Sequence, residues 1–201
     1  MKVEDVKKVA VMGAGDMGHG IAEVALLAGY KVAMRDIEQR FVDKGLSRIK
    51  ESLDKLVEKQ KITADNQKTM LANIKTFVDI AESVKDADFV VEAVPEIMDL
   101  KKQVFQALDK AAPKHAILAS NTSNMSITEI AAVTKRPEQV VGVLVALVRI
   151  PGQAFAYNPI EIQGQPGADD DFSMRNLAEV MAAQEAPMMR AVRSFCIAQA
   201  F

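Results

Sequence analysis

The stretch VAVMGAGDMG, residues 9–18, decides the fold of this chain. Its first four residues are apolar and suit a short buried strand, and its three glycines suit a tight turn that opens a helix over residues 17–28. A second apolar run, residues 31–34, follows that helix, and Asp36 comes 18 residues after Gly18. Strand, glycine turn, helix, strand and acidic residue come in the order of a dinucleotide-binding βαβ unit.

Each glycine of the turn has a separate physical role in such a unit. Gly13 permits the tight turn out of the strand, Gly15 lets a pyrophosphate approach the backbone, and Gly18 lets the helix pack closely on the sheet. The amides of the first helical turn, where Asp16 and Met17 lie, then face the phosphates at the positive end of the helix dipole.

The carboxylate of Asp36 indicates which dinucleotide this turn binds. It can accept hydrogen bonds from the adenosine ribose hydroxyls and it repels a 2′-phosphate, so the sequence predicts NAD rather than NADP. Arg35 tempers this preference without reversing it. The alternative is a glycine-rich turn in an unrelated α/β protein, because glycine patterns by themselves are common.

Composition and charge exclude several classes of partner. The chain has 201 residues, a net charge of −2, two histidines and one cysteine, Cys196. Without a dominant basic run or many aromatic side chains we expect no nucleic-acid partner, and the few cysteines and histidines predict no metal site. The longest apolar stretch, residues 140–148, is too short to span a bilayer, so we expect no membrane partner. The single cysteine and the acidic start favour the cytoplasm.

Strand and helix patterns alternate over residues 8–143, which predicts an α/β, Rossmann-type fold with a doubly wound, mostly parallel sheet. Further helices are expected over residues 38–60, 63–74, 80–85 and 99–112, and further strands over 76–78, 89–94, 116–119 and from Val140. The helical pair at about 38–74 is expected to project from the core. We expect a nucleotide-binding domain in residues 1–150 and a tail in 151–201 that is first turn-rich and then helical.

Three motifs together resemble one protein family. They are the unit of residues 9–36, the run VVEAVPE at residues 90–96 with Lys101 after it, and SNTS at residues 120–123. Over residues 6–143 the chain resembles the NAD-binding domain of 3-hydroxyacyl-CoA dehydrogenases. The resemblance implies that the three glycines and Asp36 hold the adenosine half of NAD, and that residues 151–201 are an incomplete or divergent remnant of the family's substrate and dimerisation domain.

The same resemblance implies roles on the substrate side. Glu96 and Lys101 match family positions near the nicotinamide and the coenzyme A thioester, Ser123 matches the serine that binds the substrate's 3-oxygen, and Asn121 lies in the same motif. The implied substrate is an acyl-CoA thioester and the implied assembly is a homo-oligomer. A second interpretation of the motif is an ordinary strand-to-helix turn, in which Ser123 or Ser126 caps the next helix.

One residue of the family's chemistry does not match. The family uses a histidine as the base that takes the hydroxyl proton, and the resemblance puts that position at Leu144. An alignment with an insertion puts Phe155 there instead. His19, beside the glycine turn, and His115, just before a strand, do not replace it. We therefore expect nucleotide binding with slow or absent turnover.

Two other functions stay open. One is a non-catalytic NAD-binding module, which predicts nucleotide binding without hydride transfer. The other is a different dehydrogenase on the same scaffold, of the 3-hydroxyisobutyrate or 6-phosphogluconate type, which share the look of the glycine turn. Asp36 and the SNTS motif fit those enzymes less well, and the sequence offers no site for their catalytic lysine.

Overall fold

The computed structural model describes residues 5–148 and 156–163, and within them seven strands form one sheet in the order β3-β2-β1-β4-β5-β6-β7. Strands β1 to β6 are parallel, and β7 runs antiparallel to β6. The strands are β1 (Lys8–Met12), β2 (Lys31–Arg35), β3 (Ile74–Phe77), β4 (Phe89–Glu92), β5 (Ile117–Ser120), β6 (Val140–Val148) and β7 (Ala156–Gln163).

Helices cover both faces of this sheet, because the buried strands send alternate side chains to opposite sides. Val9 and Val11 of β1 join the apolar cluster beneath the first three helices, whereas Ala10 and Met12 join the cluster beneath the last three. The helices are α1 (Asp16–Leu27), α2 (Gln39–Glu58), α3 (Ala64–Asn73), α4 (Ile80–Val84), α5 (Met98–Ala111) and α6 (Ile127–Ala131), with a short 3-10 turn, Pro137–Gln139, before β6.

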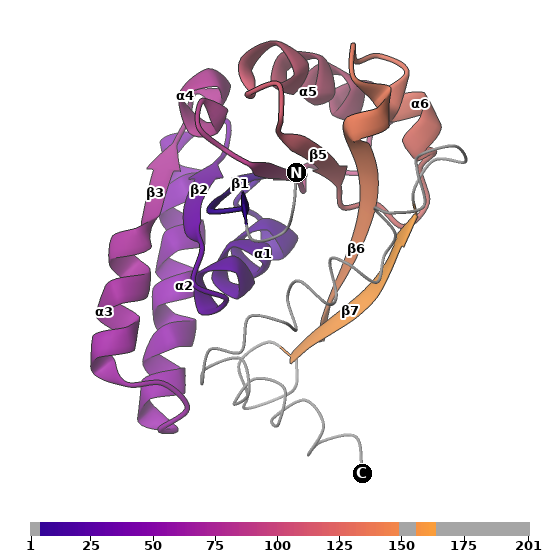
Figure 1. The fold of residues 1–201 in the computed structure, drawn as a ribbon. Helices are drawn as coiled ribbons and strands as arrows, with labels where there is room; N and C mark the ends of the chain where they lie inside the picture. Colours follow the sequence, from indigo (N-terminus) through magenta and orange to yellow (C-terminus); the bar gives the residue numbers. More distant parts are fainter. Residues whose placement is uncertain (1–4, 149–155, 164–201) are drawn as a thin grey trace.

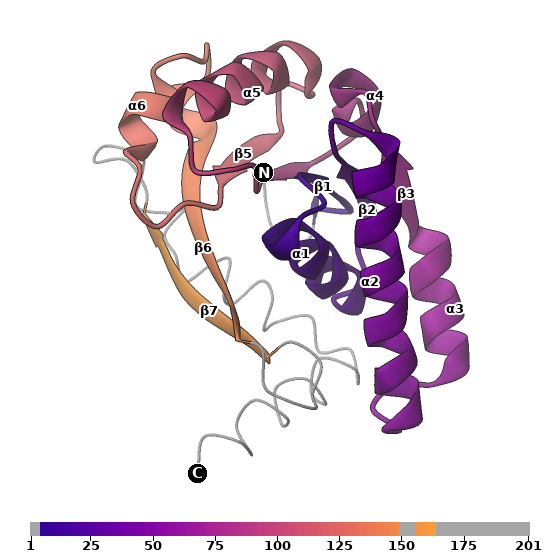
Figure 2. The same cartoon turned by 180° about the vertical axis from the view of Figure 1, so that it is seen from behind.

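The helical pair expected after the second strand is confirmed. Figures 1 and 2 show α2 and α3 side by side, extending past the ends of β2 and β3. The apolar stripe predicted for the longer helix faces the core, since Ile49 and Leu53 are fully buried. Thr63 begins α3 with a reciprocal capping box to Asn66, which satisfies two of the amides left free at a helix start.

The predicted elements agree with the observed ones to within about two residues at each end, the usual uncertainty of helix and strand bounds. The fold class is therefore confirmed. One element differs from expectation: β7 lies in the segment where only turns were expected, although it contains Pro159. The helix expected towards the end of the chain lies outside the described residues, and the domain boundary near residue 150 stays a prediction.

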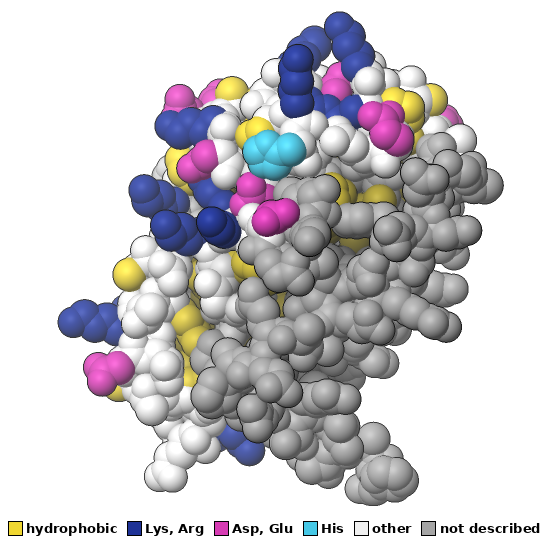
Figure 3. All heavy atoms as spheres, viewed as in Figure 1, with side chains coloured by type: hydrophobic (Ala, Val, Ile, Leu, Met, Phe, Trp, Pro, Cys, Tyr) yellow, Lys and Arg dark blue, Asp and Glu magenta, His cyan; other side chains and the backbone are white. Residues whose placement is uncertain are grey.

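On the face shown in Figure 3, basic side chains are interspersed with acidic ones. His115 is one of the exposed groups, and its Nε2 lies 3.0 Å from Asp88 Oδ1. Asp88 also accepts hydrogen bonds from the amides of Lys7 and Lys8, so it joins the starts of β1, β4 and β5. None of the helices in the described ranges is both long enough and apolar enough to pass through a membrane.

Candidate functional site

The sequence-predicted site residues follow strands that end at the same edge of the sheet. Met12 of β1 is the register partner of Arg35 on one side and of Glu92 on the other, and Glu92 in turn pairs with Ser120. The chain runs from β1 outwards to β2 and β3 on one side and to β4, β5 and β6 on the other. The crevice at such a reversal, beyond the carboxyl ends of the strands, is where open α/β sheets bind ligands.

The glycine turn after β1 has geometry that only glycine allows at two positions. Gly13 has φ of +106°, and a Cβ there would lie 2.6 Å from the carbonyl oxygen of Ala93. A Cβ on Gly18 would lie 1.8 Å from the carbonyl oxygen of Gly13, so the first turn of α1 packs directly on the loop. These two glycines therefore shape the turn.

Gly15 differs from both, because a Cβ there would meet nothing within 4 Å. It is exposed, and it is the N-cap of α1 with no side-chain hydrogen bond to the first-turn amides. Behind it His19 is buried and its Nδ1 lies 2.6 Å from the Gly15 carbonyl oxygen, which can only accept, so Nδ1 carries the proton. The space over Gly15 is thus open towards the start of a helix.

The remaining two residues of the predicted phosphate site, Asp16 and Met17, are more exposed than Gly13 and Gly18. Met17 is half-buried, and Asp16 projects into solvent. Asp16 Oδ1 lies 2.5 Å from Arg48 Nη1 of α2, and this hydrogen bond and charge lower the pKa of Asp16 below its ordinary value. The arginine offsets the negative charge that Asp16 would otherwise place beside a bound phosphate.

Asp36 lies just beyond β2 and holds the glycine turn from the side. Its Oδ2 accepts from the Ala14 amide and its Oδ1 from the Ile37 amide, each at 2.7 Å. An ionised carboxylate has about four acceptor positions, so both oxygens keep room for a further donor. Arg35 turns away, donating from Nε to the Val78 carbonyl oxygen at 2.6 Å, and burial lowers its pKa.

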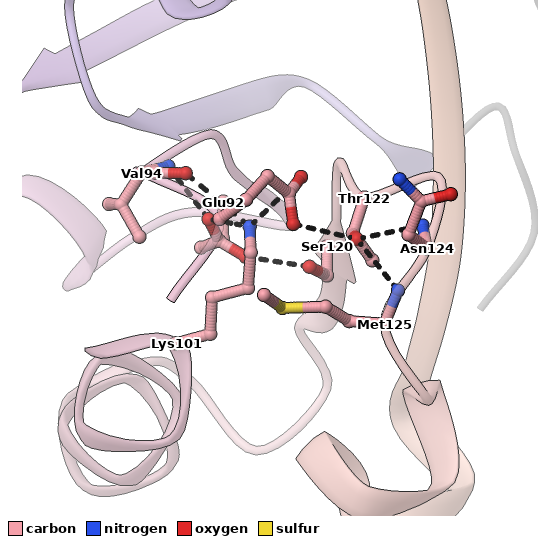
Figure 4. A network of polar contacts seen from close by, with 8 residues as sticks. Glu92, Val94, Lys101, Ser120, Thr122, Asn124 and Met125 are labelled. Carbon is pink, nitrogen blue, oxygen red and sulfur yellow. Dashed lines mark hydrogen bonds and ion pairs between the residues drawn. The ribbon is translucent and has the colours of Figure 1, made fainter. Parts of the chain in front are cut away.

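On the other side of β1 a buried ion pair joins α5 to the ends of two strands (Figure 4). Glu92 and Lys101 are both fully buried, with Lys101 Nζ 2.8 Å from Oε1 and 3.0 Å from Oε2. The carboxylate also accepts from Ser120 Oγ at 2.6 Å and from the Val94 amide at 2.7 Å. These four hydrogen bonds, two of them from Lys101, fill the acceptor capacity of Glu92.

Lys101 is therefore placed differently from an exposed cofactor ligand. Its third donor points to the Val94 carbonyl oxygen at 3.4 Å, so an ammonium group with three protons has three protein acceptors. Glu96 Oε1 lies 3.8 Å from the same nitrogen, and the Glu96 side chain is half-exposed. A direct contact between Lys101 and a ligand would have to replace one of these bonds.

The SNTS motif forms the turn between β5 and α6. Asn121 and Thr122 are buried, whereas Ser123 is exposed. Ser126 is the residue that caps α6, accepting from the Glu129 amide at 3.2 Å. Of the two serines considered for the cap, the structure uses Ser126. The motif thus presents Ser123 at the same sheet edge as Glu96.

Two contributors to this site were missed by sequence reasoning. Gly45 of α2 packs on the glycine turn, where its Cβ would lie 2.8 Å from the Ala14 carbonyl oxygen. No local pattern predicts this contact between distant segments. Glu92 is the second. An acidic residue at the end of an apolar strand indicates a buried carboxylate that needs a cationic or hydrogen-bonding partner, and this signal could have identified it.

Position 144, where the resemblance places the family's base, lies within β6. The backbone of Leu144 pairs with Ile160 of β7, just after an irregularity in the register, and the strand continues to Val148. His115 comes just before β5, at the opposite end of that strand from Ser120. His19 lies in the first turns of α1, with its Nδ1 at the Gly15 carbonyl oxygen.

The residues on the β2 side of the crevice fit the adenosine and pyrophosphate of NAD. The space over Gly15 would admit a pyrophosphate, with the first-turn amides of α1 beside it. The free acceptor positions of Asp36 would suit ribose hydroxyls. On the β4 side, Glu96, Ser123 and Asn124 have exposed polar side chains.

Comparisons with known proteins match the part of the chain that carries this site. The family model for the 3-hydroxyacyl-CoA dehydrogenase NAD-binding domain matches residues 8–144. A probable 3-hydroxybutyryl-CoA dehydrogenase of Bacillus subtilis is 44% identical over 138 residues, covering 69% of this chain and 48% of the relative. A 3-hydroxybutyryl-CoA dehydrogenase of Clostridioides difficile is 40% identical over 67% of this chain and 48% of its own length.

Solved structures give the same result. The crystal structure of (S)-3-hydroxybutyryl-CoA dehydrogenase from Ralstonia eutropha superposes with a TM-score of 0.68 at 37% identity, covering 71% of this chain and 50% of that one. The chain thus spans about half the length of the bacterial relatives described above. It belongs to the 3-hydroxyacyl-CoA dehydrogenase family, and residues 8–144 are the NAD-binding domain of that family.

Proposed function

We propose that NAD lies across the crevice between the β1 and β4 ends. Asp36 would accept from the adenosine ribose, and the pyrophosphate would rest over Gly15 and the first-turn amides at Asp16 and Met17. The nicotinamide would then lie on the β4 side, near Glu96 and Ser123. The observation that carries this proposal is the open space over Gly15, in a turn where Gly13 and Gly18 leave no room for a Cβ.

The reaction proposed for this site is the interconversion of a 3-hydroxyacyl-CoA and a 3-ketoacyl-CoA. NAD supplies the acceptor for the hydride that leaves C3, and a base must take the proton of the 3-hydroxyl group. Ser123, exposed at the strand edge, would hydrogen-bond the 3-oxygen, and Asn121 would support the turn. Lys101 would support the site without contacting the ligand, because its three N–H groups already donate to Glu92 and the Val94 carbonyl oxygen.

Turnover is expected to be weak because leucine occupies position 144. A general base contributes a factor of roughly 10² to 10⁴. The second candidate function is an NAD-binding module without hydride transfer, which the leucine at position 144 leaves open. The two candidates share NAD binding and differ in their effect on an acyl-CoA thioester.

Three further parts of the proposal concern the whole protein. An acyl-CoA thioester is the proposed small-molecule partner, and a homo-oligomer is the proposed assembly; both rest on the family resemblance. A cytoplasmic location rests on Cys196 being the single cysteine, which is typical of a reducing compartment. Sedimentation and cell fractionation would check the last two.

The experiment that separates the candidates is a calorimetric titration with NADH, followed by acetoacetyl-CoA in the same cell while the near-ultraviolet absorbance of NADH is recorded. Binding followed by loss of that absorbance supports a working dehydrogenase, and then a base other than histidine must be sought. Binding without oxidation supports the module. A folded protein that fails to bind NADH contradicts both. NADPH in place of NADH is the matched control, and weaker binding is expected because Asp36 repels the 2′-phosphate.

A further inference from the structure

Thr122 is the hydrogen-bonding centre of the turn after β5. Its Oγ1 donates to Glu96 Oε2 at 2.9 Å, and it accepts from the amides of Asn124 and Met125 at 3.3 and 3.1 Å (Figure 4). A hydroxyl group has one proton and two lone pairs. All of them are used within the protein, so Thr122 has no capacity left for a ligand.

The bond to Glu96 is not part of the local turn. Glu96 belongs to the loop after β4, 26 residues earlier in the chain. The two hydrogen bonds from the backbone amides would by themselves form a common threonine turn. The hydrogen bond that Thr122 donates to Glu96 connects this turn to a different loop. Ser123 lies between Thr122 and Asn124, and is therefore held by hydrogen bonds on both sides while its own side chain is exposed.

The hydrogen-bond network continues from Glu96 into the core. Glu96 Oε1 lies 3.8 Å from Lys101 Nζ, and Lys101 is fixed by the fully buried carboxylate of Glu92, which also accepts from Ser120 Oγ. Both ends of the SNTS turn are thus attached to one buried ion pair. Glu96, Ser123 and Asn124 have exposed side chains, whereas Thr122 is buried between them.

We propose that Thr122 is a positioning residue. Its hydroxyl group couples the Glu96 loop to the turn carrying Ser123, and so fixes the relative positions of Glu96 and Ser123 on the nicotinamide side of the crevice. This inference rests on the proposed NAD site and deepens it. Thr122 lies on the β4–β5 side of the reversal, whereas Asp36 lies on the β2 side. Loss of the Thr122 hydroxyl group should therefore weaken the binding of the nicotinamide half and spare that of the adenosine half.

The test uses Thr122→Val, which keeps the shape and removes the hydroxyl group, and Thr122→Ser, which keeps the hydroxyl group. Fluorescence titration gives the dissociation constant for NADH, and calorimetry gives it for ADP, which lacks the distal ribose and the nicotinamide. We expect Thr122→Val to weaken NADH binding by about three- to tenfold, the loss of one net hydrogen bond, with ADP binding unchanged. Thr122→Ser should restore NADH binding.

Amide hydrogen exchange provides the structural readout. The Asn124 and Met125 amides should exchange faster in Thr122→Val and as in the parent in Thr122→Ser. Thr128→Val removes an exposed threonine hydroxyl group from the neighbouring helix and serves as the matched control, with no change in either measurement.

Each outcome decides the matter. Equal losses of NADH and ADP binding in Thr122→Val would indicate general loosening and overturn the inference, as would unchanged NADH binding. Failure of Thr122→Ser to restore binding would also overturn it. If the parent protein binds neither ligand, the proposed NAD site fails and the inference fails with it. That result is distinguishable because it is seen before any substitution.

Discussion

Lys101 Nζ lies 2.8 Å from Glu92 Oε1, and both side chains are fully buried. Removing two charges from water is costly, and a buried pair is stable only when its remaining donors and acceptors are also satisfied. Ser120, the Val94 amide and the Val94 carbonyl group meet this requirement here. The pair therefore connects α5 to the edge of the sheet at the site.

Replacement of Lys101 by methionine should destabilise the protein strongly. The substitution keeps the apolar stem but leaves the Glu92 carboxylate buried without its counter-charge, which costs about 3–5 kcal/mol. Urea denaturation measures the free energy of unfolding. Lys102→Met is the matched control, because it removes a partly exposed ion pair with Glu129 and should cost less than about 1 kcal/mol. Similar losses in the two variants would contradict the role given to the buried pair.

Glu23 provides a test by pH. It is buried in α1, its Oε1 accepts from Ser52 Oγ at 2.6 Å, and within the described residues its Oε2 has no hydrogen-bond partner. Burial raises its pKa from 4.5 to about 7, although the Ser52 hydrogen bond opposes this change. Because the folded state holds this proton more tightly than the unfolded state, the stabilising contribution is present below about pH 4.5 and is lost as pH rises through 7.

Glu23→Gln should remove this pH dependence. Relative to the parent, its free energy of unfolding should increase by up to about 3 kcal/mol between about pH 4 and pH 8, at about 1.4 kcal/mol per unit of pKa shift. Thermal or urea unfolding across that range measures the difference. Glu51→Gln, which removes an exposed carboxylate from α2, is the matched control. A constant difference for Glu23→Gln would show that the pKa of Glu23 is the same in the folded and unfolded states, and would contradict the effect of burial.

The glycine turn and Asp36 were predictable because their signal is local. Spacing along the chain places Gly13, Gly15 and Gly18 in one turn, and the next strand brings Asp36 beside it. The burial of Lys101 was not predictable in this way. Lysine is almost never fully buried, and its partner Glu92 comes from a strand that only the folded sheet places against α5.

The strand β7 was missed for a related reason. Pro159 and the turn residues on either side argue against a strand, since proline cannot donate to a β-ladder. Proline is nevertheless tolerated on an edge strand, and β7 is at the edge of the sheet in the part of the chain that is described. Whether an apolar strand such as β6 gains a further neighbour is a tertiary property.

Replacement by alanine should cost much more stability at Gly18 than at Gly15. At Gly18 a Cβ would lie 1.8 Å from the Gly13 carbonyl oxygen, so Gly18→Ala should destabilise the protein by about 3 kcal/mol, the upper part of the usual range for overpacking. At Gly15 a Cβ meets open space, and φ is −69°, so Gly15→Ala should cost about 1 kcal/mol or less.

Binding should separate the same two variants. Gly15→Ala should stay folded and lose NADH affinity by about ten- to hundredfold, because its methyl group occupies the space proposed for the pyrophosphate at a steric cost of about 1–3 kcal/mol. Urea unfolding and NADH titration of the same samples check both parts. Unchanged NADH affinity in Gly15→Ala would place the phosphates elsewhere.

Asp36→Asn should change the choice of nucleotide. The substitution removes the negative charge that faces the ribose, and asparagine keeps one acceptor oxygen for the Ala14 or Ile37 amide. Hydrogen bonds to a charged group contribute about 1.5–3 kcal/mol, so NADH affinity should fall by about ten- to hundredfold. NADPH affinity should fall less or rise, because the repulsion of its 2′-phosphate is removed. Asp43→Asn, on the exposed side of α2, is the matched control and should leave both affinities unchanged. If the ratio of the two affinities stays constant in Asp36→Asn, the preference for NADH is set by another group, and Arg35 would be the next residue to substitute.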